Sequence, residues 1–247
     1  WGVDSLSGLR TVDVYMTKLR SKLAEYNDPR LSRAFITKQG TSGKEQAPGT
    51  ADNAVYAPNG TPEQGTSKYG TSLFMYSISA PTLLLSYHEL KFLEAEALCR
   101  LERDAKSALK DAVVAGLLNA ENSFTISRKE LGKTLINAAS SITEAEAESY
   151  FDNTIEAKYT AEPLKTTMTQ KYFALWGASG EATESYNDVR RMKGLGENFI
   201  ELKNPNSFPL RCPYGNSDTT TNAEVKAAYG NGQYVYSENV WWAGGSR

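Results

Sequence analysis

The sequence predicts a mainly α-helical protein with long irregular loops. Apolar residues recur at helical spacing in the segments 7–26, 81–120 and 162–193. A stretch rich in Gly, Thr, Ser, Pro, Asn and Tyr separates the first two of these segments over residues 39–80. The chain is expected to be irregular again after residue 195. Helices therefore form the predicted framework, and the polar stretches form its connections.

The predicted helices follow in chain order. The first covers Ser7–Tyr26, with one apolar face, and ends at Asn27-Asp28-Pro29 because a residue before proline avoids the helical region. Pro81–Arg103 is apolar on two faces, which predicts a helix buried between neighbours on both sides. Asp104–Ala120 is expected to be its partner. Weaker helices are expected over 129–140 and 143–158.

The stretch Met168–Arg191, MTQKYFALWGASGEATESYNDVRR, lies within a predicted pair of helices joined by a glycine-containing turn. Pro163 suits the first turn of the first helix, and Gly177 supplies its end. The second helix has acidic residues in its first turns and basic residues in its last, as the helix dipole favours. These residues are Glu181, Glu184, Arg190, Arg191 and Lys193.

Composition excludes several classes of protein. The 247-residue chain has a net charge of −2, which argues against a nucleic-acid partner or an anionic membrane surface. No apolar run approaches the roughly 18 residues of a membrane span. The two cysteines, Cys99 and Cys212, define no disulfide framework. We expect Cys99 to be free, and a bridge between the two stays open.

The ionisable residues do not predict a reactive centre. His88 is the only histidine and lies in an apolar helix, so a core histidine is favoured over a zinc ligand or a triad member. Glu96 is expected to pair with Arg100 four residues on, and Glu89 or Glu94 to reach a neighbouring helix. Asp188 and Arg191 are expected to brace their helix. No cofactor or metal is predicted.

The polar stretch before residue 81 carries the candidate ligand-binding residues. Flat aromatic rings beside amide and hydroxyl groups suit the faces and hydroxyls of sugars. Loops held on a rigid scaffold are frequent binding sites. The alternative, that the tyrosines only pin the loop, stays open. The candidates are Asn53, Tyr56, Asn59, Tyr69 and Tyr76.

Several motifs occur together in one order. Asp28-Pro29-Arg30, the helix Leu85–Ala97, and Arg211, Pro213 and Tyr214 accompany the motif-rich helix pair. This set resembles the SusD/RagB family of nutrient-binding outer-membrane lipoproteins. The residues that fit the family pattern in the helix pair are Gln170, Lys171, Ala174, Leu175, Trp176, Gly180, Glu181, Tyr186, Asn187, Asp188, Arg190 and Arg191.

The resemblance implies a tetratricopeptide-like helical-repeat scaffold. It implies that residues 1–247 are the C-terminal part of one SusD-like domain, with the N-terminal repeats and the lipid anchor outside this chain. The expected location is the cell-surface face of the outer membrane. The expected function is non-catalytic binding of glycans, or of peptides, for delivery to a TonB-dependent (SusC-like) transporter.

Two other functions stay open. One is an all-α glycan-active hydrolase that uses a Glu pair on the helix containing Glu89 and Glu94. The other is a helical-repeat adaptor without a ligand. Trp176, at the end of an amphipathic helix, is expected in the core. Of Trp241 and Trp242, one is expected to pack inward and the other to be half exposed.

Overall fold

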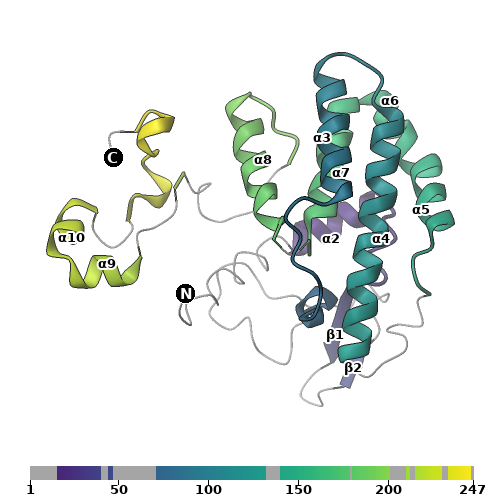
Figure 1. Ribbon diagram of the computed structural model, residues 1–247, viewed down its shortest axis with the longest axis horizontal. Coiled ribbons are helices and arrows are strands. Elements are labelled where there is room, and N and C mark those ends of the chain that lie inside the picture. The colour runs from purple at the N-terminus through teal and green to yellow at the C-terminus, as the bar shows by residue number, and fades with distance from the viewer. Residues whose placement is uncertain are drawn as a thin grey trace. The chain divides into compact units, whose positions relative to one another are not determined.

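The computed structural model describes residues 16–39, 44–46, 71–131, 140–178, 180–200, 210–211, 215–229 and 233–245 (Figure 1). The chain divides into two compact units, Trp1–Glu201 and Leu202–Arg247, and each is described by itself. The prediction of a mainly α protein is confirmed. The prediction that residues 1–247 form one domain stays a prediction.

Helices dominate the first unit. Its α-helices are α2 (Met16–Glu25), α3 (Tyr87–Arg100), α4 (Lys106–Glu130), α5 (Glu144–Tyr150), α6 (Glu156–Ala161), α7 (Pro163–Leu175) and α8 (Ala182–Gly194). A 3-10 turn, η3 (Leu73–Tyr76), precedes α3, and a π-helical turn, η4 (Phe151–Ile155), joins α5 to α6. Three short strands are β1 (Phe35–Gln39), β2 (Lys44–Gln46) and β3 (Thr71–Ser72).

The second unit contains short helical elements. They are α9 (Asn216–Thr221), α10 (Ala223–Tyr229) and the 3-10 turns η5 (Gln233–Tyr236) and η6 (Trp241–Ala243). The prediction of an irregular chain after residue 195 is therefore wrong for these residues. Ser, Asp and Thr favour helix caps over helix interiors, so NSDTTT gives little helical signal. Trp241 and Trp242 are 75% and 62% exposed, so the prediction that one packs inward is also wrong.

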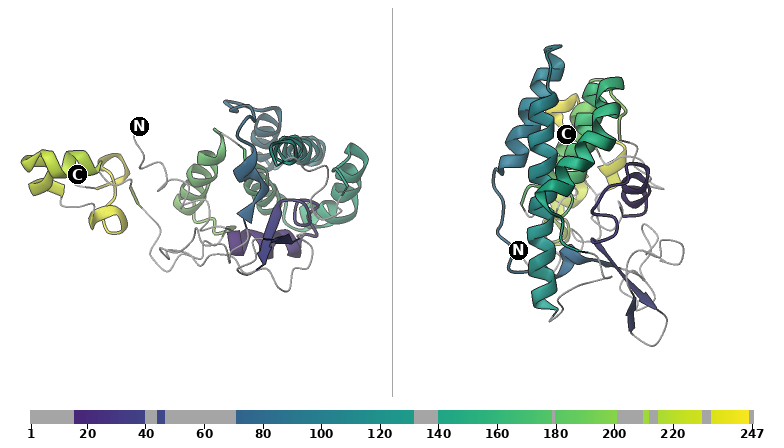
Figure 2. Two further views of the ribbon diagram at one scale, coloured as in Figure 1. Left: turned by 90° about the horizontal axis from the view of Figure 1, so that it is seen from below. Right: turned by 90° about the vertical axis from the view of Figure 1, so that its right-hand side faces the viewer.

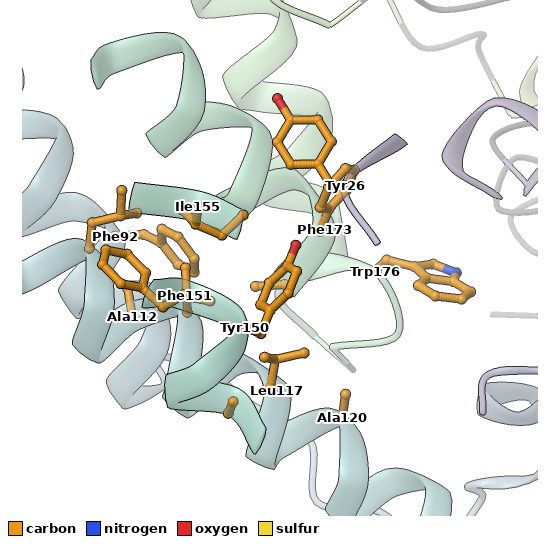
Figure 3. Close-up of a cluster of buried hydrophobic side chains, with 14 of the residues drawn as sticks. Tyr26, Phe92, Ala112, Leu117, Ala120, Tyr150, Phe151, Ile155, Phe173 and Trp176 are labelled. Carbon is orange, nitrogen blue, oxygen red and sulfur yellow. The ribbon is translucent and has the colours of Figure 1, made fainter. Parts of the chain in front are cut away.

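The core of the first unit lies where α7 packs against both α3 and α4, and α5 also packs against α4. Figure 3 shows Phe92, Phe151 and Phe173 in this core, each fully buried. Small residues let the helices approach. A Cβ added at Gly116 of α4 would lie 3.0 Å from the Cβ of Ala174 in α7, so glycine fits this crossing and a larger residue would push the helices apart.

Local signals set the helix boundaries. The Ser86 hydroxyl accepts a hydrogen bond from the backbone N–H of Glu89 at 3.1 Å, so α3 begins at Tyr87, six residues later than predicted. Pro163 occupies the first turn of α7 as predicted. Gly177 follows that helix with φ at +79°, a conformation that favours glycine. The helix pair at 163–194 is thus confirmed.

Other predicted elements need correction. Helix α4 continues to Glu130, ten residues beyond the expected Ala120, because its apolar face continues through the fully buried Phe124. The expected helix over 129–140 overlaps only the end of α4, and residues 132–139 lie outside the described part. The expected helix at 143–158 is present as α5, η4 and α6, and Thr143 caps its start.

The small sheet lies within and just before the stretch predicted to be irregular. Strand β1 pairs antiparallel with β2 and with β3, in the order β2-β1-β3. Thr37 lies opposite Gln46, and Phe35 lies opposite Ser72. The strands have two to five residues and carry several polar side chains, so they produce no period-two apolar pattern.

Helix α3 is buried on one face only. Phe92 and Ala95 are fully buried, whereas Leu90 and Leu93 are 51% and 42% exposed. The expectation of neighbours on both sides is therefore wrong for the described chain. Both views in Figure 2 show α3 on the side of the helical cluster away from α2.

Candidate functional site

The predicted ligand-binding residues fall largely outside the described structure. Asn53, Tyr56, Asn59 and Tyr69 lie outside the described residues. Tyr76 ends η3, and its side chain is likewise outside what the structure describes. Their role in binding a ligand stays a prediction.

The structure does describe how this loop is attached. Residues 47–70 leave from β2 and return into β3, and both strands pair with β1. The backbone N–H of Leu73 donates to the carbonyl of Ala34 at 2.7 Å. The Ser127 hydroxyl in α4 donates to the carbonyl of Leu73, also at 2.7 Å. The strands on either side of the segment 47–70 therefore belong to one small sheet that is tied to the helical core.

Aromatic contacts strengthen this base. The ring of Phe74 in η3 lies with its centroid 4.9 Å from that of Phe124 in α4 and 4.9 Å from that of Trp176 after α7. Edge-on and tilted arrangements at this separation are favourable. Trp176 is 9% exposed, as expected for a core residue. Trp176 therefore supports the base of the loop from inside the protein.

The motif residues of α3, α7 and α8 form a buried ionic cluster, which we define as Glu89, Lys171 and Asp188. The Lys171 ammonium lies 3.2 Å from Glu89 Oε1 and 2.9 Å from Asp188 Oδ2. Lys171 is only 2% exposed. A buried charge is tolerated when it is paired, so this lysine joins three helices through two carboxylates.

Burial and charge oppose each other in this cluster. Burial lowers the pKa of Lys171. The charges and hydrogen bonds of Asp188 and Glu89 raise that pKa by a larger amount, so the net shift is upward. Burial raises the pKa of Glu89, and Lys171 offsets only part of that rise. One oxygen of Glu89, Oε2, has no hydrogen-bond partner among the described residues. Lys171 is thus held charged beside a carboxyl group that binds its proton more tightly than usual.

A second set of ion pairs extends from α8 toward the end of α3. The Arg191 guanidinium binds both oxygens of Glu96, one of them at 2.8 Å, and Asp188 Oδ1 at 2.8 Å. Arg100 donates to Glu96 at 2.7 Å and to both oxygens of Glu197. The predicted pairs Glu96–Arg100 and Asp188–Arg191 are confirmed. Glu96 connects them, which the helix spacing alone did not indicate.

Asp28-Pro29-Arg30 forms a further buried pair. Arg30 Nε and Nη2 donate to the two oxygens of Asp28 at 2.8 and 2.6 Å, and both residues are nearly fully buried. The Tyr150 hydroxyl lies 3.2 Å from Asp28. Burial first, and then the charge of Asp28, raise the pKa of Tyr150 well above its usual range. This motif ties the turn after α2 to α5.

His88 is a core histidine, as expected, and is 2% exposed. Its Nε2 lies 3.6 Å from Glu181 Oε2, and neither atom has a hydrogen-bond partner among the described residues. The other oxygen of Glu181 accepts from the backbone N–H of Ser86. Burial lowers the pKa of His88, Glu181 raises it and Arg30 lowers it, with a net downward shift. Glu181 therefore ties the start of α8 to the start of α3.

These clusters suit a scaffold better than a reactive centre. Glu89 is 6% exposed and engaged by Lys171, while Glu94 is exposed and 3.0 Å from Lys91. Across the ranges that the structure describes, no group of three or more His, Cys, Asp and Glu side chains is placed to hold a metal ion. Cys99 is a free thiol 3.6 Å from the Thr167 hydroxyl. Cys212 lies outside the described residues, as do Pro213 and Tyr214.

The sequence contained only part of this arrangement. Spacing along one helix indicates Glu96–Arg100, but Lys171–Asp188 joins two helices and has no local signal. The pair of Arg33 with Glu146, whose atoms lie 3.0 Å apart, was missed for the same reason. The available signal was the presence of Lys171 and Asp188 among the motif residues of α7 and α8.

None of the described helices combines the length and apolar composition needed to cross a membrane.

Comparisons with known proteins agree with this geometry. A profile of the SusD-like family, described as "Starch-binding associating with outer membrane", matches residues 5–214. A solved SusD/RagB family protein from Bacteroides thetaiotaomicron is 63% identical, with a TM-score of 0.82, over 94% of this chain and 50% of that protein. None of the curated proteins compared with the chain is similar to it.

Two more distant structures share the fold. One is a SusD homologue from Bacteroides fragilis, with 18% identity and a TM-score of 0.59, over 93% of this chain and 51% of that one. The other is an outer-membrane protein from Bacteroides vulgatus, described in connection with nutrient binding, with 20% identity and a TM-score of 0.60. The match covers 91% of this chain and 50% of the Bacteroides vulgatus protein. The chain spans about half the length of these solved relatives.

The fold and its buried charges define a helical scaffold protein whose motif residues bind one another. The family match and the 63% identical structure make the assignment specific. The chain belongs to the SusD/RagB family.

Proposed function

We propose that the protein binds glycans or oligosaccharides without cleaving them and delivers them to a TonB-dependent (SusC-like) outer-membrane transporter. The observation that carries this proposal is membership of a family described as starch-binding and associated with the outer membrane. The proposed location is the cell-surface face of that membrane, through a lipid anchor.

The described geometry supports a binder in two ways. Lys171 and Asp188 of the family motif are buried and paired with each other, and Lys171 also pairs with Glu89, so these groups are not available to a ligand or a scissile bond. The segment 47–70, which holds Asn53, Tyr56, Asn59 and Tyr69, connects β2 and β3, which both pair with β1 and are tied to α4 through Leu73. A loop on a rigid base can present its aromatic and amide groups with little ordering cost.

The binding experiment uses the intact protein and calorimetry with maltoheptaose, together with a panel of other oligosaccharides and peptides. The variant Tyr56→Ala/Tyr69→Ala is expected to weaken binding of the preferred ligand at least tenfold. The matched control is Tyr236→Ala, which alters a tyrosine that is 44% exposed in the second unit. Equal binding by both variants would remove these tyrosines from the site. Absence of any glycan or peptide ligand, with the transporter still bound, would favour the adaptor.

The hydrolase alternative has its own test. The intact protein is incubated with each glycan that binds, and new reducing ends are counted. We expect none above the background without protein. Release that disappears in Glu89→Gln and in Glu94→Gln would replace the binder by a glycan-active enzyme.

A further inference from the structure

The residues just before α3 lie against the turn that joins α7 to α8. The backbone N–H of Ser86, the N-cap residue of α3, donates to Glu181 Oε1 at the start of α8. Gly180 has φ at +87°, and a Cβ added there would overlap the carbonyl oxygen of Leu83. The backbone of the turn therefore touches the segment 77–86, and Glu181 stabilises the contact through a charged acceptor.

The segment 77–86 connects this contact with the small sheet. It follows η3, which comes directly after β3. A Cβ added at Gly177, in the same turn between α7 and α8, would overlap the Phe74 ring of η3. The turn thus contacts both ends of the connection between the sheet and α3. A change at Glu181 is therefore placed to alter how this connection is held.

His88 places a titratable group without a hydrogen-bond partner beside Glu181. Its Nε2 lies 3.6 Å from Glu181 Oε2, which is too long for a hydrogen bond. Both residues are 2% exposed, and neither atom has a hydrogen-bond partner among the described residues. Buried polar atoms are normally paired, and an exception calls for an explanation. Here one of the two atoms can gain a proton and the other can carry a negative charge.

Charges on neighbouring elements act on His88 in opposite directions. Glu181 favours the protonated imidazole, whereas Arg30, in the turn after α2, opposes it. Burial is the largest influence, and it lowers the pKa of His88 below the reference value of 6.5, so the neutral imidazole is favoured. The other charged groups of this buried network are paired with one another: Asp28 with Arg30, and Lys171 with Glu89 and Asp188.

We propose that His88 and Glu181 form an acid-sensitive latch between the start of α3 and the turn before α8. At neutral pH the imidazole is uncharged and Glu181 accepts from the Ser86 N–H. When Nε2 of His88 takes a proton from solvent, the imidazolium competes with that N–H for the Glu181 carboxylate. A buried charge also favours an open arrangement in which His88 reaches water. The segment 77–86 then separates from the turn.

The direction of the pH dependence follows from proton binding. The closed arrangement binds the His88 proton more weakly than the open one, in which the pKa of the imidazole is close to the reference value of 6.5. The latch is therefore unaffected above about pH 7 and weakens as pH falls from there to the lowered pKa of the closed arrangement. A difference of one unit between the two pKa values makes the open arrangement about tenfold more populated.

The first measurement is an NMR titration of His88, the only histidine of the chain. We expect its pKa to be below 6.5 in the unsubstituted protein. In Glu181→Gln the pKa should be lower still, because glutamine keeps an oxygen for the Ser86 N–H but removes the charge that favours the imidazolium. The matched control is Glu184→Gln, which alters an exposed glutamate of α8 and should leave the pKa of His88 unchanged.

The second measurement is hydrogen–deuterium exchange of the Ser86 amide at about pH 7.5 and about pH 5, corrected for the pH dependence of exchange in unstructured peptides. Its protection should fall by at least about threefold at the lower pH in the unsubstituted protein. In His88→Gln, which cannot gain this proton, the protection should stay the same. The internal reference is the Leu109 amide of α4, which donates to the carbonyl of Ala105 at 2.9 Å and should keep its protection in both proteins.

Three results would overturn the proposal. These are a pKa of His88 at or above 6.5, a pKa that does not change in Glu181→Gln, and a loss of Ser86 protection that is equal in the unsubstituted protein and in His88→Gln. Far-ultraviolet circular dichroism checks that each variant is folded. The titration and the comparison of Ser86 with Leu109 both use the unsubstituted protein, so they decide the question even where a variant does not fold.

Discussion

Replacing Lys171 with methionine tests whether the buried ionic cluster holds the helices together. Methionine keeps the length and helix propensity of lysine but removes the ammonium group. That group lies 3.2 Å from Glu89 and 2.9 Å from Asp188, and its side chain is 2% exposed. Removing one partner of a buried pair leaves the other charge uncompensated and costs about 3–5 kcal/mol. At about 2–4 °C per kcal/mol for a chain of this size, the melting temperature should fall by about 6–20 °C.

The assay is thermal and chemical unfolding followed by far-ultraviolet circular dichroism at neutral pH. The matched control is Lys110→Met, because Lys110 also pairs with a carboxylate, Asp152 at 2.7 Å, but at the surface of α4. Exposed pairs contribute little, so the control should shift the transition much less. The triple variant Lys171→Met/Glu89→Gln/Asp188→Asn removes all three charges together. It should recover most of the lost stability, because no buried charge is left alone.

The pH dependence of the stability loss in Lys171→Met tests the reasoning most directly. Burial already raises the pKa of Glu89 above its reference value of 4.5, so the folded state binds this proton more tightly than the unfolded state. Loss of Lys171 raises that pKa further. The deficit of Lys171→Met should therefore be largest at neutral pH and shrink as pH falls and the Glu89 carboxyl group becomes neutral. A deficit equal to that of Lys110→Met, or one unchanged at acidic pH, would refute the reasoning.

Two further predictions concern the junctions of the same helices. Gly177→Ala should cost about 2–4 kcal/mol in unfolding experiments, because φ is +79° and the added Cβ would overlap the Phe74 ring. Gly194→Ala has no atom within 4 Å of its Cβ and should be neutral or slightly stabilising, so equal effects would contradict this account. Burial raises the pKa of Glu96, but hydrogen bonds from Arg191 and Arg100 lower it by more. Its stabilisation is thus fully present above about pH 4.5 and is lost as pH falls through the lowered pKa of the folded state, so the deficit of Glu96→Gln should close over that range in acid unfolding curves.

Local signals explain what the sequence could predict. Pro163, Gly177 and the apolar spacing between them define α7 to within one or two residues. The pairs Glu96–Arg100 and Asp188–Arg191 follow from helical geometry alone. Each of these features depends on residues within a few positions of one another.

Contacts between segments far apart in the sequence could not be predicted from such local signals. Lys171 meets Glu89 and Asp188 only after three helices have packed, and nothing in their spacing along the chain indicates it. The two apolar faces of α3 predict two neighbours, but a pattern of apolar residues does not say which chain supplies them. The strands β2 and β3 have only three and two residues, too few for any periodicity. Four of the predicted ligand residues lie in 47–70 and the fifth, Tyr76, ends η3, and the sequence alone supports their assignment.

The pairing of β2 and β3 on either side of β1 has a practical consequence for diversity. Both ends of the intervening segment meet at one fixed platform, so its length can change without moving a helix. Doubling such a segment costs only about 0.6 kcal/mol in closure entropy. If the proposed binding role of this segment holds, transplanting it between homologues should exchange the ligand preference, while the ion-paired helices keep their geometry.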